Sequence, residues 1–131
     1  MKQTEAGRKE ALLVMAHGSP RPIANADMAR VVEEVKRRNV FSIVEIAFLE
    51  CNAPTIPEAI ATCAAAGATH ILAVPYFLHT GKHVADDLPS LLEQAQAQYP
   101  HIVFRLGDYL GRSESVTHVL LERTRTAIEN E

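Results

Sequence analysis

The strongest constraint on the fold is an alternation of short apolar runs with helical patterns, repeated four times along the chain. The runs cover residues 11–16, 42–49, 69–75 and 102–106, and they are largely apolar rather than alternating. Such runs are typical of strands buried on both faces of a parallel sheet. The pattern therefore predicts an α/β three-layer sandwich, flavodoxin-like, with a four-stranded parallel sheet of order 2-1-3-4 and helices on both faces.

Helical spacing of apolar residues predicts helices between the strands and after the last one. The first runs from about Asn25 to Arg38, and the last is marked by residues 116–128. Thr55-Ile56-Pro57-Glu58 has the form of a capping box at the start of the second, and Gly67 provides a left-handed stop after it. Pro89 indicates that the third helix begins close to that residue.

Length and composition exclude several classes of protein. At 131 residues we expect one domain over residues 11–131, preceded by a flexible arm over residues 1–10. The formal charge of −3 gives no general attraction to nucleic acid, and no apolar run reaches the ~20 residues that cross a membrane. Cys51 and Cys63 form no paired motif, and no hydrophobic leader is evident, so we expect a reduced, cytoplasmic protein.

Polar side chains follow each predicted strand at its carboxyl end, where such sheets bind ligands. His17 follows the first strand, Glu50 the second, His79 and His83 the third, and Asp108 the fourth. These side chains could meet at one edge of the sheet although they are far apart in sequence. Imidazoles with a carboxylate can hold a divalent metal loosely or accept protons.

The simpler interpretations stay open at several of these positions. His17 could merely cap its strand. The motifs of two other classes of protein, the serine-hydrolase elbow and the phosphate-binding loops, are absent from the sequence. His79 and His83 have the spacing of a helical zinc pair, but Gly81 interrupts it. Acidic residues 86 and 87 are expected to be helix caps rather than ligands. Cys51 is adjacent to Glu50 and could face the site, but a small buried packing role is favoured.

Three sequence blocks resemble the small class II chelatases of the CbiX type, the sirohydrochlorin cobaltochelatases and ferrochelatases. They are A-H-G-S at residues 16–19, A-F-L-E followed by A-P-T-I-P-E-A-I at residues 47–60, and P-Y-F-L-x-x-G-K-H-V-x-x-D-L-P at residues 75–89, with a later L-G at 110–111. The similarity covers nearly the whole chain, from Leu12 to about Arg125. The third block is long and ordered, which makes it the most specific of the set.

The resemblance implies a lyase that inserts cobalt or iron into sirohydrochlorin without ATP, in siroheme or cobalamin biosynthesis. The family's two essential histidines match His17 and His83, and its glutamate matches Glu50. His79 stands where the family more often has phenylalanine, so it is either an added metal ligand or an incidental substitution. The family's L-G-P-H reads L-G-R-S here, at residues 110–113, so any contribution from that histidine is missing, and Arg112 is expected to meet a substrate carboxylate instead. The short length resembles family members that pair as homodimers.

The hypothesis drawn from these residues has the metal, Co2+ or Fe2+ with Ni2+ as a third candidate, as substrate, with no permanently bound cofactor. His17 and His83 would hold the metal and accept the displaced protons, and Glu50 would assist. A non-catalytic metal or tetrapyrrole carrier is the alternative, and it differs from an enzyme in lacking turnover. The tetrapyrrole is expected to be contacted by apolar residues, a mobile glycine loop and local cations: Tyr76, Phe77, Leu78, Gly81, Arg21, Lys82 and Arg112.

Overall fold

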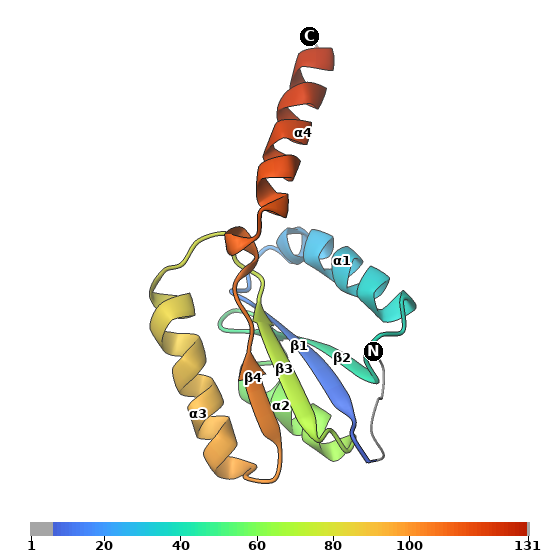
Figure 1. Cartoon of the computed structure of the whole chain (residues 1–131). Helices are drawn as coiled ribbons and strands as arrows, with labels where there is room; N and C mark the ends of the chain where they lie inside the picture. Colours follow the sequence, from blue (N-terminus) through green and yellow to red (C-terminus); the bar gives the residue numbers. More distant parts are fainter. Residues whose placement is uncertain (1–6, 131) are drawn as a thin grey trace.

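The computed structural model describes residues 7–130, and its centre is a four-stranded parallel sheet (Figure 1). The strands lie in the order β2-β1-β3-β4, so the predicted α/β class and strand order are confirmed. β1 pairs along its length with a neighbour on each side, which explains why its residues are almost all buried. The bounds are β1 (Glu10–Ala16), β2 (Ile43–Phe48), β3 (His70–Pro75) and β4 (Val103–Leu106).

Three helices pack on the sheet and divide the core into two clusters. On one face α1 (Ala26–Arg37) places Met28 and Val32 against β1 and β2. On the other face α2 (Ile56–Ala65) and α3 (Leu88–Gln98) cover a larger cluster that includes the fully buried Leu13 and Ile71.

Local signals in the sequence set the helix ends as predicted at several points. The Thr55 hydroxyl accepts a hydrogen bond from the Glu58 backbone N–H, and the Glu58 carboxylate accepts one from the Thr55 N–H, so the capping box is confirmed. Gly67 has a φ of 90° in the stop after α2. Short 3-10 turns, η1 (Pro22–Asn25) and η3 (Leu110–Arg112), precede α1 and α4 (Ser115–Glu129).

The last predicted helix, α4, forms but covers neither face of the sheet. It projects from the body of the molecule (Figure 1), and all residues from Thr117 to Asn130 are exposed. The three-layer arrangement with helices on both faces therefore holds, but α1 is the only helix of the described chain on its face. Among the described residues, no helix is long and apolar enough to span a membrane.

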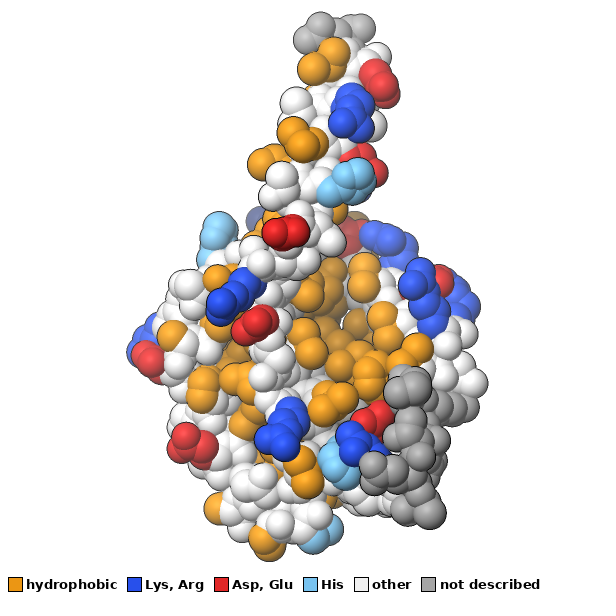
Figure 2. All heavy atoms as spheres, in the orientation of Figure 1, with side chains coloured by type: hydrophobic (Ala, Val, Ile, Leu, Met, Phe, Trp, Pro, Cys, Tyr) orange, Lys and Arg blue, Asp and Glu red, His pale blue; other side chains and the backbone are white. Residues whose placement is uncertain are grey.

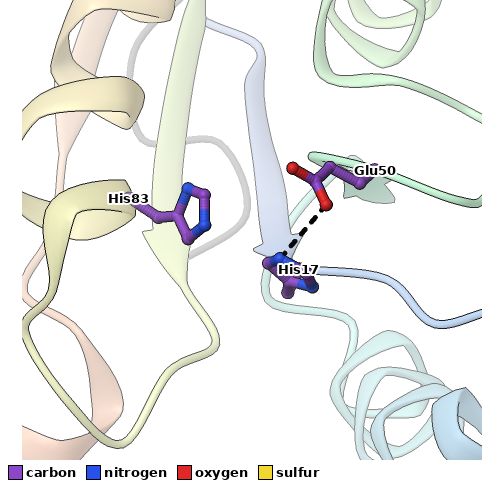
Figure 3. Close-up of side chains that lie close together, drawn as sticks. All are labelled: His17, Glu50 and His83. Atoms are coloured by element: carbon purple, nitrogen blue, oxygen red, sulfur yellow. Dashed lines mark ion pairs between the residues drawn. The ribbon is translucent and has the colours of Figure 1, made fainter.

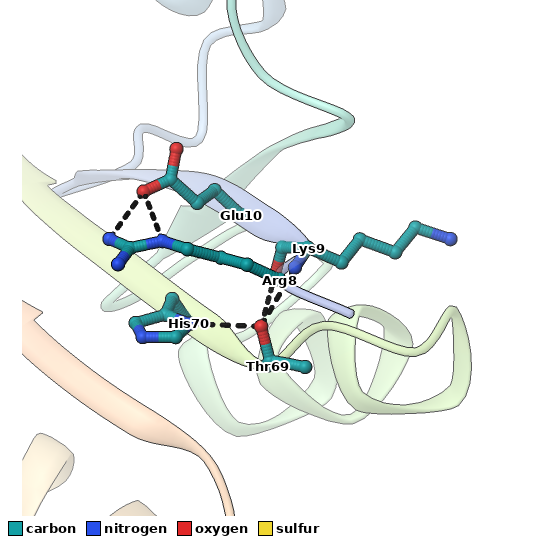
Figure 4. Close-up of polar contacts among 5 residues, drawn as sticks. All are labelled: Arg8, Lys9, Glu10, Thr69 and His70. Carbon is teal, nitrogen blue, oxygen red and sulfur yellow. Dashed lines mark hydrogen bonds and ion pairs between the residues drawn. The ribbon is translucent and has the colours of Figure 1, made fainter. Parts of the chain in front are cut away.

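The edge of the sheet where the strands begin is held by a local polar network (Figure 4). The Thr69 hydroxyl accepts from the Lys9 backbone N–H at 2.8 Å and lies 2.9 Å from His70 Nδ1, while Arg8 pairs with Glu10 at 2.7 Å. His70 is thus occupied at the edge far from the carboxyl ends of the strands. Of the arm predicted over residues 1–10, residues 1–6 lie outside the described chain, and Glu10 belongs to β1.

Candidate metal centre

His17 and Glu50 are brought together by the register of the sheet. The parallel ladder of β1 and β2 continues beyond both strands: Leu49 N–H donates to the Ala16 carbonyl, and Glu50 N–H donates to the His17 carbonyl, each at 2.9 Å. This pairing sets the two side chains beside each other, with His17 Nε2 3.4 Å from Glu50 Oε2. Their proximity follows from strand pairing across 33 residues of sequence.

The two loops that carry these residues are tied together tightly. Gly18 has a φ of 95°, and a Cβ on it would overlap the Glu50 carbonyl oxygen, so the A-H-G-S motif requires glycine here. The Asn52 side-chain oxygen accepts from the Ser19 backbone N–H at 2.7 Å and from the Asn25 amide at 3.2 Å. The sequence reasoning missed Asn52, whose only signal was an asparagine in a loop next to Glu50.

Cys51, which lies between Glu50 and Asn52, does not have the buried packing role that was predicted. Its thiol is exposed and its φ is 69°, because the chain turns sharply between Glu50 and Asn52. The buried cysteine is Cys63 of α2, where burial raises the pKa of the thiol to about 11. Cys63 packs in the core away from the candidate site.

His83 is positioned by a π-helical turn, η2 (His83–Asp87), that leads directly into α3. Pro89 has no N–H to donate to Ala85 in α-helical register, which favours the wider turn at this point. The His83 Nδ1–H donates to Asp87 Oδ2 at 2.8 Å, and Lys82 Nζ donates to the other Asp87 oxygen at 3.0 Å.

Asp87 is therefore a partner of His83 rather than the helix cap that was predicted. It occupies the N-cap position of α3, but its side chain makes no capping hydrogen bond. The hydrogen bond from Lys82, followed by that from His83, lowers the pKa of the Asp87 carboxyl, which keeps it anionic beside the imidazole. The four-residue spacing of His83 and Asp87 was a visible signal that the sequence reasoning did not use.

The three side chains from three different loops point toward one space (Figure 3). One ligand atom from each of His17, Glu50 and His83 lies within 4.8 Å of the other two, and the two imidazole centroids are 5.0 Å apart. His17 Nδ1 donates to the Gly18 carbonyl at 3.1 Å, and His83 Nδ1 is used by Asp87, so the Nε2 atom of each ring is left to bind a ligand. Two imidazole nitrogens and a carboxylate suit a divalent transition metal.

The group is open to solvent, with side-chain exposures of 47% for His17, 57% for Glu50 and 38% for His83. An open position is what a site needs if a metal is to enter and leave. A hollow of about 350 Å³ adjoins Glu50 and His83 and extends along α3. The hollow is also lined by Leu49, Asp87, Ser90, Leu91 and Gln94. Of these, Ser90 and Gln94 were not predicted from the sequence.

The remaining predicted metal candidates lie outside this group. His79 is exposed and does not belong to the cluster of ligand atoms found among the described residues. Asp108 is also outside the cluster, and its Oδ1 atom lies 3.9 Å from Arg112 Nη1.

The predicted tetrapyrrole contacts fall into two sets. Arg21, Lys82 and Arg112 are exposed near the carboxyl ends of the strands, although Lys82 is already paired with Asp87. Tyr76 packs against the core cluster under α1, and Phe77 packs against the core cluster under α3. Both side chains are therefore partly buried by contacts with the core. Leu78 is 61% exposed, and Gly81 has open space around it.

Comparison with known proteins identifies the family of this chain. A family model described as CbiX matches residues 11–127. The chain belongs to the CbiX family. It is 42% identical over 83 residues to a sirohydrochlorin cobaltochelatase of Methanococcus aeolicus, covering 63% of this chain and 58% of that protein. It is 32% identical over 117 residues to a sirohydrochlorin ferrochelatase of Bacillus subtilis, covering 89% and 45%.

A solved structure shares the fold of this CbiX chain closely. The sirohydrochlorin chelatase SirB of Bacillus subtilis subspecies spizizenii, in complex with cobalt, matches with a TM-score of 0.84 and 34% identity. The match covers 90% of this chain and 50% of SirB. The chain thus spans about half the length of these CbiX relatives.

Proposed function

We propose that this chain is a sirohydrochlorin chelatase, a lyase that inserts cobalt or iron into sirohydrochlorin without ATP in siroheme or cobalamin biosynthesis. The observation that carries the proposal is the convergence of His17, His83 and Glu50 on one open space in a CbiX-family chain. The names of the relatives, which include cobalto- and ferrochelatases, support the reaction and the two metals.

Metal insertion requires groups that bind a cation and accept protons at the same place. Metal insertion breaks two pyrrole N–H bonds and forms metal–nitrogen bonds, so two protons leave as the dication enters. Imidazole has an ordinary pKa of about 6.5, and one nitrogen can therefore hold a metal and later accept a proton near neutral pH. The Nε2 atoms of His17 and His83 hold the incoming metal, release it to the macrocycle and accept the protons.

Glu50 and the surrounding cations complete the proposed site. Glu50 lies 3.4 Å from His17 Nε2, where its negative charge favours a bound dication. The open hollow beside Glu50 and His83 leaves one side of the group accessible to a flat substrate. We propose that the carboxylates of the tetrapyrrole meet Arg21, Lys82 and Arg112 and that its ring contacts Tyr76, Phe77, Leu78 and Gly81.

Asp87 is proposed as a positioning residue that orients His83 through its Nδ1 atom. A carboxylate bound to the second nitrogen of a metal-binding imidazole fixes the ring and raises its basicity, and losing it commonly costs about 10- to 100-fold in metal affinity or activity. We expect Asp87→Asn to lower the insertion rate about tenfold and to raise the metal concentration at half-maximal rate. Asp86→Asn removes the same charge from an exposed neighbour and should leave both quantities unchanged. Equal effects of the two variants would show that only local charge matters.

The assignment is tested by turnover with the purified chain. Sirohydrochlorin is incubated with Co2+, Fe2+ or Ni2+ separately, and the absorbance change of the macrocycle gives initial rates. We expect many turnovers per chain and a rate above that of the uncatalysed reaction for cobalt or iron. Binding that saturates at one equivalent without acceleration would instead assign the chain as a metal or tetrapyrrole carrier. A homodimer and a cytoplasmic location are further parts of the proposal, and the resemblance supports the first.

A further inference from the structure

The hollow beside Glu50 and His83 has a wall that the proposed metal ligands do not use. Four residues on one side of a helix form this wall along α3: Asp87, Ser90, Leu91 and Gln94. Their spacing of i, i+3, i+4 and i+7 makes a single stripe along the helix. Leu88 and Leu92 are buried in the core, so the rotation of α3 about its axis is fixed. The stripe is therefore held toward the hollow.

Two side chains of this stripe have hydrogen-bonding groups that a ligand can use. Both oxygens of Asp87 are already occupied, one by His83 and the other by Lys82. Ser90 and Gln94 make no side-chain hydrogen bond within the described chain other than the long contact of 3.5 Å from Gln94 Nε2 to Ser90 Oγ. A hydroxyl and a side-chain amide can both donate hydrogen bonds. Beyond Asp87, the wall thus presents uncharged donors.

The position of these donors matches the rim of the proposed substrate. A tetrapyrrole binds its metal at the centre and carries its carboxylates at the rim, so a site that holds the metal meets the carboxylates some distance away. Along the helix axis, Ser90 and Gln94 lie about 5 Å and about 10 Å from Asp87. The hollow of about 350 Å³ is at the lower end of the range of about 300–1,000 Å³ for ligand pockets. It can therefore take one edge of the macrocycle rather than the whole ring.

Other pairings of surface and ligand fit less well. The hollow between α1 and the base of α4 is apolar (Figure 2), and half-buried side chains such as Leu72 and Val74 of β3 point to that face of the sheet. Such a surface has little to offer a carboxylate. A divalent metal prefers imidazole and carboxylate ligands, which the stripe does not carry beyond Asp87. Uncharged donors are better suited to an anionic group of the macrocycle.

We propose that Ser90 and Gln94 bind one rim carboxylate of the tetrapyrrole and hold that edge of the macrocycle beside His83. The Ser90 hydroxyl and the Gln94 amide each donate a hydrogen bond to the carboxylate, and Leu49 and Leu91 pack against the apolar edge of the ring. The cations of the neighbouring loops meet the other carboxylates. This inference rests on the proposed function and adds to it two residues that determine how tightly the tetrapyrrole binds.

The contact is tested by binding in the absence of metal. Sirohydrochlorin is titrated with the full chain, and its absorbance change gives the dissociation constant. We expect Gln94→Glu to weaken binding at least about tenfold, because two carboxylates then face each other, and Gln94→Lys to tighten it about threefold. Ser90→Ala removes one hydrogen bond and should weaken binding about 3- to 10-fold. Gln98→Glu makes the same charge change one turn farther along α3, outside the hollow, and should bind like the unmodified chain.

The opposite effects of the two charged variants identify what occupies the hollow. In turnover, the KM for sirohydrochlorin should change by the same factors, with the metal concentration at half-maximal rate unchanged. If the hollow held the hydrated metal instead, Gln94→Glu would lower that metal concentration and Gln94→Lys would raise it, with sirohydrochlorin binding unaffected. This result, or unchanged binding in all variants at positions 90 and 94, would overturn the inference alone. An unmodified chain that binds no sirohydrochlorin would overturn the proposed function as well.

Discussion

Replacing His17 or His83 by alanine is expected to lower the rate of metal insertion at least about 100-fold without unfolding the protein. Each substitution removes one of two imidazoles that hold the metal and accept a pyrrole proton, and proton-transfer groups alone contribute about 10²–10⁴-fold. Both side chains are substantially exposed, so truncating them leaves no cavity in the core. Because the two residues act on one metal, the double variant should be little worse than either single one.

The measurement is the initial rate of sirohydrochlorin metallation at limiting and at saturating metal, together with circular dichroism and urea unfolding for each variant. His101→Ala is the matched control, because His101 is exposed before β4 at the opposite edge of the sheet. Full rates for both His17→Ala and His83→Ala at limiting metal would remove these histidines from the mechanism. A weak effect at saturating metal with a strong effect at limiting metal would limit them to metal capture.

The sequence was sufficient for the features that depend on local pattern. Continuously apolar strands and the spacing of apolar residues predicted a parallel sheet, and right-handed crossovers limited the strand order. The positions of the strand ends then predicted that residues such as His17, Glu50 and His83 lie at one edge of the sheet. The distance between His17 and Glu50 depends on strand register, which is set by the ladder between β1 and β2.

The sequence was not sufficient for contacts that depend on how loops and helices are oriented. Asp87 was interpreted as a helix cap because acidic residues before a helix usually are caps, whereas the π-helical turn directs it to His83. The apolar spacing of α4 predicted a helix but contained no information on whether its apolar side is buried within the same chain. Cys51 was assigned to the core by its residue type, but the sharp turn after Glu50 exposes it.

Gly18→Ala is expected to destabilise the protein strongly. Two independent costs act at this position: a φ of 95°, which costs an alanine about 1–2 kcal/mol, and overlap of the new Cβ with the Glu50 carbonyl oxygen. Forcing extra atoms into a packed position typically costs about 1–3 kcal/mol more. We therefore expect the free energy of unfolding to fall by about 2–5 kcal/mol, a large part of the ~5–15 kcal/mol of an ordinary domain.

Gly67→Ala separates the two costs. Gly67 has a φ of 90°, but the nearest atoms to its Cβ position are the end of the Lys9 side chain at 3.9 Å, so only the backbone term applies. Urea unfolding should give about 1–2 kcal/mol for Gly67→Ala with unchanged metal insertion. Gly18→Ala should lose more stability and also lose insertion, because the Glu50 backbone must move and carries its carboxylate away from His17. Equal losses of stability in the two variants would mean that the loops carrying His17 and Glu50 can separate without cost. Insertion retained in both variants would mean that the close approach of His17 and Glu50 is not needed for the reaction.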